Sequence, residues 1–146
     1  MKLTYSRKKS KTLIRDKKTR GFLKEVDVKD ESPNKLIIGD NLGSMKCLLH
    51  DYHYKKKIDL VYIDPPFSTN NNFLINGDRA TTISSSKKGE LAYSDKLKGQ
   101  DFIEFLRERL LVLYELMSDR ASIYLHIDYK VGHYVKVMMD EIFGIE

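Results

Sequence analysis

Residues 58–67 read IDLVYIDPPF, a strand pattern followed directly by a turn pattern. The first six residues are nearly continuous in apolar character, which is typical of a central strand of a parallel sheet that is covered on both faces. The strand must end at Asp64, because Pro65 and Pro66 have no N–H to donate to a ladder of strands. We therefore expect a buried parallel strand followed at once by a turn that carries an acid, two prolines and Phe67.

The segments on either side of this strand are read from their apolar spacing. Residues 35–38 (KLII) predict a short strand, and the residues after it predict a short helix with Asp40 or Asn41 as its N-cap. Residues 68–98 are rich in Ser, Thr, Asn, Gly and Lys without a sustained period, which predicts a long flexible loop.

The second half of the chain carries two helix patterns around one strand pattern. Apolar residues at helical spacing predict a long helix from about Asp101, where Glu104 three residues on resembles half of a capping box. A strand over 121–127 and a helix over 132–143, ended by Gly144, complete the order. The alternation predicts an α/β fold in which a parallel sheet is flanked by helices.

Polar clusters follow three of the expected strands. They are residues 39–40, 64–67 and 126–128, and ligands of parallel sheets bind at the carboxyl ends of the strands. The sequence therefore predicts a binding site at this edge. We expect His126 and Tyr124 to serve structural roles, since a zinc role for His126 lacks partner ligands.

The composition excludes several classes of protein. The chain has 146 residues, of which 41% are hydrophobic and 32% charged, and this suits one domain. No apolar run approaches the roughly 20 residues that span a bilayer, and the basic start lacks the apolar segment of a secretory signal. The single cysteine, Cys47, excludes an internal disulfide framework and a multi-cysteine zinc site. We expect a cytoplasmic protein with no membrane partner.

The positive charge is concentrated at one end of the chain. Residues 1–20 hold nine of the 26 lysines and arginines and one acid, whereas the remaining residues are slightly acidic. We expect residues 1–34 to be a weakly ordered basic arm and residues 35–146 to be the folded portion. Such an arm suits salt-sensitive contacts with phosphate groups, although a solvated leader is an equally good interpretation.

The turn at residues 64–67 (DPPF) has a specific chemistry. Prolines fix the backbone and hold its carbonyl groups in set directions, and a carboxylate beside a carbonyl presents two acceptors to a group with two N–H donors. An exocyclic amino group of a nucleobase is such a group, and a flat side chain such as that of Phe67 can stack on its ring. The four residues therefore suit an aminated base that has left its stack in the duplex.

This motif resembles that of the S-adenosylmethionine-dependent amino-methyltransferases of DNA. Most of residues 34–146 resemble the permuted, or beta, class of adenine-N6 enzymes of bacterial restriction–modification systems, which includes the type III modification subunits. Residues 34–42, 91–95, 105–109 and 123–128 also resemble stretches of that family, and they occur in the family's order. The resemblance implies a Rossmann-like methyltransferase fold, of which this chain is a part.

The resemblance also implies roles for the motif residues. Asp64 would accept one amino hydrogen of adenine and the carbonyl of Pro65 the other, Pro66 would stiffen the turn, and Phe67 would stack on the flipped base. Double-stranded DNA would be the substrate and S-adenosyl-L-methionine the methyl donor, with Asp40 as a candidate contact to the donor's adenine. An acid at the first position favours adenine N6. A cytosine-N4 or RNA amino-methyltransferase and an inactive nucleic-acid-binding remnant are the alternatives.

The family also uses a glycine-rich Phe-x-Gly-x-Gly loop to hold its methyl donor, and this sequence has no such pattern. The chain thus resembles the N-terminal catalytic portion of a longer enzyme. We expect little methyl transfer by the chain alone, and we expect a C-terminal fragment or a restriction subunit as its protein partner.

Overall fold

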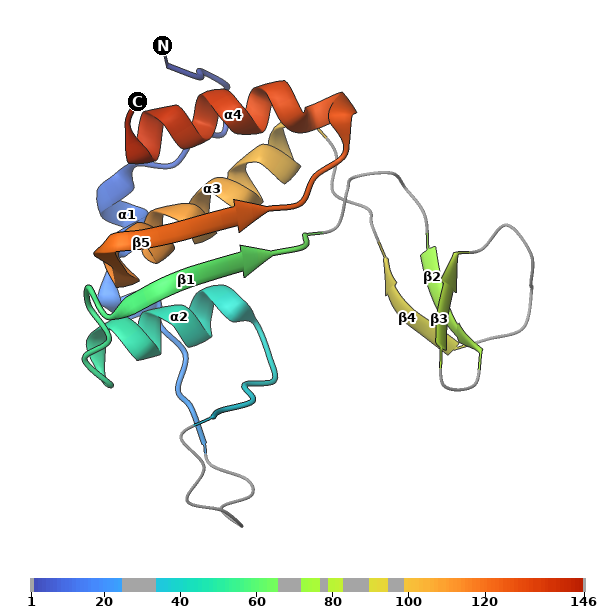
Figure 1. The fold of residues 1–146 in the computed structure, drawn as a ribbon, viewed down its shortest axis with the longest axis horizontal. Coiled ribbons are helices and arrows are strands. Elements are labelled where there is room, and N and C mark those ends of the chain that lie inside the picture. Colours follow the sequence, from blue (N-terminus) through green and yellow to red (C-terminus); the bar gives the residue numbers. More distant parts are fainter. Residues whose placement is uncertain are drawn as a thin grey trace.

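The computed structural model describes residues 2–24, 34–65, 72–76, 79–82, 90–94 and 99–145 (Figure 1). Its helices are α1 (Lys11–Arg15), η1 (Lys17–Thr19, a 3-10 turn), α2 (Asn41–His50), α3 (Gly99–Leu116) and α4 (Tyr129–Phe143). Its strands are β1 (Ile58–Ile63), β2 (Asn72–Asn76), β3 (Arg79–Thr82), β4 (Glu90–Ser94) and β5 (Met117–Leu125).

Strands β1 and β5 form a parallel pair, and the chain passes through α3 between them. The register runs from Leu60 opposite Ser122 to Ile63 opposite Leu125. Both strands point the same way in Figure 1, and each of α2, α3 and α4 runs back in the opposite direction. This is the predicted α/β arrangement of parallel strands flanked by helices, and it is confirmed as a partial fold of this type.

Helix α3 is the centre of the core. One group of its side chains, which includes Phe102 and Leu110, packs with Val135 and Met138 of α4. The opposite group, which includes Leu111 and Leu116, packs with α1 and α2. Although α3 has 18 residues, neither it nor another helix in the described ranges is long and apolar enough to cross a membrane.

The expectation that β1 is covered on both faces is wrong for the described part of the chain. Val61 is buried, but Leu60 is 61% and Tyr62 71% exposed, and Tyr124 opposite Tyr62 is 60% exposed. Alternate residues of a strand point to opposite faces of the sheet. The helices therefore cover one face of the β1–β5 pair, and the face that carries Tyr62 and Tyr124 is open.

Three further local predictions need correction. Residues 35–38 form no strand, and Leu36 and Ile38 are exposed, because no described strand pairs with them. Glu104 does not close a capping box, since its carboxylate lies in the core, where it pairs with Arg107. The β5 strand also begins four residues before the predicted residue 121.

Within residues 68–98, where we expected a loop, the described segments form a three-stranded antiparallel sheet of order β3-β2-β4. Strands of four or five residues are too short to produce a recognisable period in such a polar sequence.

The N-terminal segment lies against the helices as far as Gly21, whose carbonyl accepts from the thiol of Cys47 in α2, and then runs away from them (Figure 1). Ser10 caps α1 by accepting a hydrogen bond from the N–H of Leu13, and Ile14 is buried between α1, α2 and α3. Five basic residues of this segment form ion pairs with acids elsewhere in the chain: Arg7–Asp101, Lys8–Glu141, Lys9–Glu108, Arg15–Glu115 and Arg20–Asp51. The described part of the expected weakly ordered arm is thus tied to the folded portion by charge complementarity, while the boundary at residue 34 stays a prediction.

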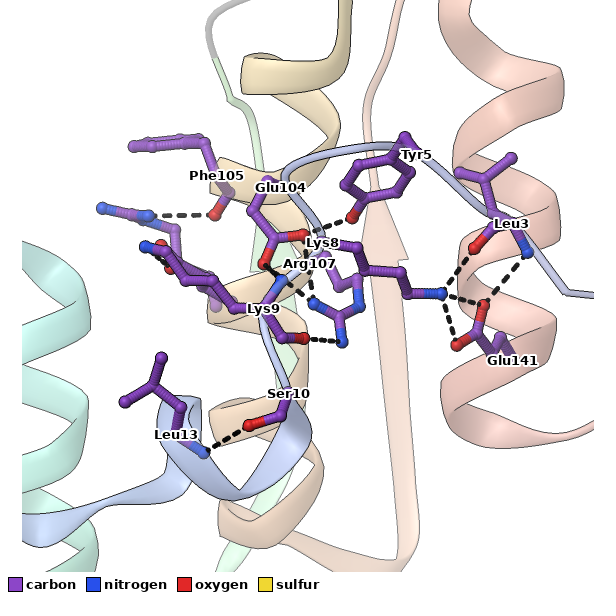
Figure 2. Close-up of polar contacts among 12 residues, drawn as sticks. Leu3, Tyr5, Lys8, Lys9, Ser10, Leu13, Glu104, Phe105, Arg107 and Glu141 are labelled. Carbon is purple, nitrogen blue, oxygen red and sulfur yellow. Dashed lines mark hydrogen bonds and ion pairs between the residues drawn. The ribbon is translucent and has the colours of Figure 1, made fainter.

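Glu104 joins the N-terminal segment to α3 (Figure 2). Its carboxylate accepts hydrogen bonds from the Arg107 guanidinium at 2.9 and 3.1 Å, from the backbone N–H of Lys9 at 3.1 Å and from the Tyr5 hydroxyl. Burial, and the carboxylate beside it, raise the pKa of the Tyr5 hydroxyl well above its usual range. The Arg107 guanidinium also donates to the carbonyl of Lys9. Tyr5 and Lys9 thus supply hydrogen-bonding partners to both members of the buried Glu104–Arg107 ion pair.

Glu141 of α4 makes the second attachment (Figure 2). Its carboxylate accepts from the ammonium group of Lys8 at 2.8 Å and from the backbone N–H of Leu3 at 3.2 Å. Burial alone would raise the pKa of Glu141, but these two donors outweigh it and hold the pKa below its usual value.

We predict that Glu141→Gln lowers the free energy of unfolding by about 1–2 kcal/mol at pH 7, because it removes a charge-assisted contact that is largely shielded from water. The folded-state pKa lies below the unfolded value of about 4.3, so this stabilisation is present above the unfolded pKa. It is lost as the pH falls through the folded pKa. Urea unfolding of wild type and variant at several pH values between 3 and 7 tests the prediction.

Asp140→Asn is the matched control, because Asp140 is the neighbouring acid and pairs with Lys136 on the same helix. The loss in Asp140→Asn should be smaller than in Glu141→Gln, about 0.5 kcal/mol, because its partner Lys136 is 67% exposed and solvent screens the pair. A Glu141→Gln effect that does not shrink as the pH falls would contradict the assignment.

Candidate active site

The parallel register brings Asp64 beside His126. Ile63 lies opposite Leu125 at the end of the ladder, and the N–H of His126 donates to the carbonyl of Ile63 at 2.9 Å. Asp64 and His126, which follow Ile63 and Leu125 in the sequence, are therefore also adjacent. The Oδ1 atom of Asp64 lies 3.1 Å from Nδ1 of His126, within hydrogen-bonding distance.

This pair is accessible from solvent. The side chains of Asp64 and His126 are each 61% exposed, whereas Pro65 is buried. A buried proline directly after an exposed carboxylate fixes the backbone on which that carboxylate stands. Pro66 and Phe67, which complete the predicted motif, lie outside the described residues.

Asp40 begins α2, as predicted. One carboxylate oxygen, Oδ2, accepts from the N–H of Gly43 at 2.8 Å, which satisfies a donor that the first turn of the helix leaves without a partner. The backbone carbonyl of Asp40 also accepts from the N–H and the hydroxyl of Ser44.

Arg109 of α3 holds this cap from the other side. Its guanidinium donates to Oδ1 of Asp40 at 3.0 Å, to Oδ1 of Asn41 at 2.6 Å and to the carbonyl of Phe105 at 2.9 Å. The guanidinium carbon lies 3.5 Å from the centroid of the Phe105 ring, so the cation also stacks on an aromatic face. Burial lowers the pKa of Arg109, and the neighbouring carboxylates of Asp40 and Glu108 oppose that shift.

The role of Arg109 is not predicted from the sequence. One feature of the sequence could have indicated it: Arg109 falls among the apolar residues of the α3 pattern, and a buried cation needs a partner of opposite charge. The partner, Asp40, is 69 residues away in the chain, so spacing alone does not reveal it.

Both groups lie at one edge of the β1–β5 pair. In Figure 1, the first turn of α2 lies at the end of the molecule to which β1 and β5 point. Asp40 therefore lies at the carboxyl edge of the sheet with Asp64 and His126, although the strand that we expected directly before Asp40 is not formed.

The carboxylate of Asp40 retains the chemistry needed to hold part of a nucleoside. Each of its oxygens has one partner, and its side chain is 65% exposed. A carboxylate oxygen has a second lone pair, so Asp40 can still accept from an amino or hydroxyl group. This acceptor fits the adenosine part of the expected methyl donor.

Asp40 both caps α2 and pairs with Arg109, and we predict that Asp40→Asn and Asp40→Ala separate these two contributions to stability. The amide oxygen of Asn can still cap α2, but it loses the charge opposite Arg109, whereas Ala loses both contacts. Thermal or urea unfolding should show that Ala costs about 1 kcal/mol more than Asn, the usual value of a lost N-cap. Equal losses in the two variants would mean that the cap contributes nothing measurable.

Comparisons with known proteins agree with this arrangement. Residues 58–146, more than half of the chain, match the family described as DNA methylase. The chain is 34% identical to the type II methyltransferase M.EcaI of Enterobacter cloacae, over 99% of this chain and 30% of that protein. It is 32% identical to the EcoP15I Mod subunit, a type III restriction-modification enzyme of Escherichia coli, over 92% and 22% of the two chains. The type II methyltransferase M.KpnI of Klebsiella pneumoniae is also 32% identical, over 84% and 27%.

The chain spans less than a third of the length of these curated relatives. The matched residues 58–146 begin with β1 and include Asp64, α3, β5, His126 and α4. The expected resemblance to the amino-methyltransferases of DNA is confirmed: this chain belongs to the DNA methylase family.

Proposed function

We propose that this chain is the catalytic-motif portion of a DNA adenine-N6 methyltransferase that uses S-adenosyl-L-methionine. The observation that carries the proposal is the exposed carboxylate of Asp64, which stands on a buried proline at the carboxyl end of β1 and is held by His126. The donor supplies a methyl group activated by its sulfonium centre. The protein must supply the position and the electronic state of the amino group that receives it.

Asp64 and Pro65 meet this need by accepting hydrogen bonds. An exocyclic amino group has two N–H bonds, and a carboxylate oxygen together with a backbone carbonyl can accept both. Two such acceptors draw the nitrogen lone pair out of conjugation with the ring and direct it at the methyl group. Catalysis then comes from orientation and from electrostatic stabilisation, with no covalent intermediate on the protein. We propose that Phe67 stacks on the flipped base and that Pro66 stiffens the turn.

Asp40 is the proposed contact to the methyl donor. Its position at the first turn of α2, at the same edge as Asp64, suits a donor that lies across the carboxyl ends of the strands (Figure 1). Arg109 of α3 donates to the Asp40 carboxylate and holds it in place. The proposed contact to the methyl donor would therefore be anchored to α3, the central helix of the core.

Double-stranded DNA is the proposed substrate, and the remainder of the enzyme and a restriction subunit are the proposed protein partners. Relatives named as Mod subunits of type III restriction-modification enzymes support this proposal. Five of the nine basic residues in the first 20 pair with acids of the chain itself. We propose that other surfaces of the enzyme also contribute phosphate contacts.

We predict that Asp64→Ala lowers methyl transfer to DNA at least about 100-fold, because it removes an acceptor aimed at the reacting amino group. The measurement is transfer of labelled methyl from S-adenosyl-L-methionine to unmethylated duplex DNA. The chain is assayed alone and with the part of M.EcaI that it does not cover, supplied as a second polypeptide. Mass analysis of the labelled nucleoside identifies the methylated base.

Asp59→Asn is the matched control, because Asp59 is an exposed acid at the other end of β1, paired with Arg120 and Ser118. Hydrogen bonds from Arg120 and Ser118 lower the pKa of Asp59 to about 2, so Asp59 carries a negative charge at the pH of the assay. Transfer should be unchanged in this variant. Label on cytosine N4 or on RNA alone would replace the proposed substrate, and activity that survives Asp64→Ala would refute the proposed chemistry.

A further inference from the structure

We infer that His126 is a positioning residue that fixes the carboxylate of Asp64 for the amino group of the base. The inference rests on the proposed function, because it assigns a role to a neighbour of the proposed acceptor. It goes beyond that function by giving His126 a specific protonated ring nitrogen and a specific oxygen of Asp64. We had expected His126 to be merely structural.

The backbone places His126 independently of its side chain. The hydrogen bond from the N–H of His126 to the carbonyl of Ile63, at 2.9 Å, continues the β1–β5 ladder by one step. Asp128 then caps α4 by accepting from the N–H of Lys130 at 2.8 Å, so residue 126 is fixed between a strand and a helix. A ring mounted on two fixed elements can hold a neighbouring carboxylate in one orientation.

The contact defines the hydrogen-bonding state of the ring. An ionised carboxylate can only accept, so a neutral imidazole must carry its proton on Nδ1 to bond Oδ1 of Asp64 at 3.1 Å. This bond uses Oδ1 and sets the plane of the carboxylate. The other oxygen, Oδ2, is then the acceptor for the amino group of the base.

The contact is not explained as a contribution to stability. Both side chains are 61% exposed, and an ion pair or hydrogen bond between exposed groups adds little to folding. Nor do the described residues around His126 include a cluster that would make it a metal ligand. We therefore assign to this contact the orientation of the Asp64 carboxylate. That orientation becomes important when the base binds and displaces water from the Asp64–His126 pair.

The first test determines the tautomer of His126 by nitrogen-15 NMR of the 146-residue chain. We expect the Nδ1–H form in the wild type and a loss of this preference in Asp64→Ala. His50, His53 and His133 provide internal controls because their signals should not change, and His126→Asn identifies the signal of residue 126. An Nε2–H tautomer in the wild type would overturn the inference.

The second test compares His126→Asn with His126→Gln in the methyl-transfer assay with the supplied second polypeptide. The side-chain amide of Asn can donate from near the place of Nδ1, whereas that of Gln donates from near the place of Nε2. We expect Asn to keep kcat within about threefold of the wild type and Gln to lower it about 10- to 100-fold with an unchanged KM for DNA. A circular dichroism melt verifies that both variants are folded.

The outcomes separate the two proposals. Loss of transfer in Asp64→Ala together with equal activities of His126→Asn and His126→Gln would overturn the role of His126 and leave the proposed function standing. Wild-type activity in Asp64→Ala would overturn both.

Discussion

The fold depends on the neutralisation of charges buried on helix α3. Glu104, Arg107 and Arg109 are each less than 10% exposed, on a helix whose other side chains form most of the core. A buried charge without a partner costs several kcal/mol, so each of these side chains needs a segment that supplies one. Glu104 and Arg107 pair with each other and with the backbone of Lys9, and Arg109 pairs with Asp40. The conformations of two segments far from α3 in the sequence therefore follow from charges on α3.

This requirement changes the interpretation of the basic N-terminus. From composition alone, a run of lysines and arginines indicates a solvated arm or a phosphate-binding surface. In the structure, Lys8 and Lys9 meet Glu141 and Glu108, and the backbone of the same segment serves Glu104. The segment is thus the counter-charge of α3 and α4. The positive net charge of this segment therefore does not by itself indicate that it binds phosphate groups.

Several elements could be predicted from the sequence, because local rules decide where they begin and end. The apolar run and the prolines fix β1 at Ile58–Ile63, Asp40 caps α2, and Gly144 ends α4 with a φ of +105°, which favours glycine. What could not be predicted depends on partners distant in the sequence. Residues 35–38 have the composition of a strand but no described neighbour to pair with, and Glu104 has the spacing of a capping box but is used by Arg107 and Tyr5. The contact between Asp64 and His126 needed the exact register of β1 and β5, which no single-strand pattern contains.

The surroundings of the Asp64–His126 pair bear on the expectation that the chain alone transfers little methyl. On the adjoining face of the sheet, Tyr62 and Tyr124 are exposed, and no helix of the described part of the chain covers them. Water therefore reaches the carboxylate and the ring, and competes for the hydrogen bond that orients Asp64. Hydrogen bonds and charge interactions strengthen as water is excluded. Whatever covers the open face, whether the rest of the enzyme or the DNA itself, would thus complete the site by shielding a pair of groups that the chain has already brought within 3.1 Å. Under the proposed function, the chain would provide the geometry of the acceptor, and the groups that cover the open face would provide the water-poor environment in which that geometry is effective.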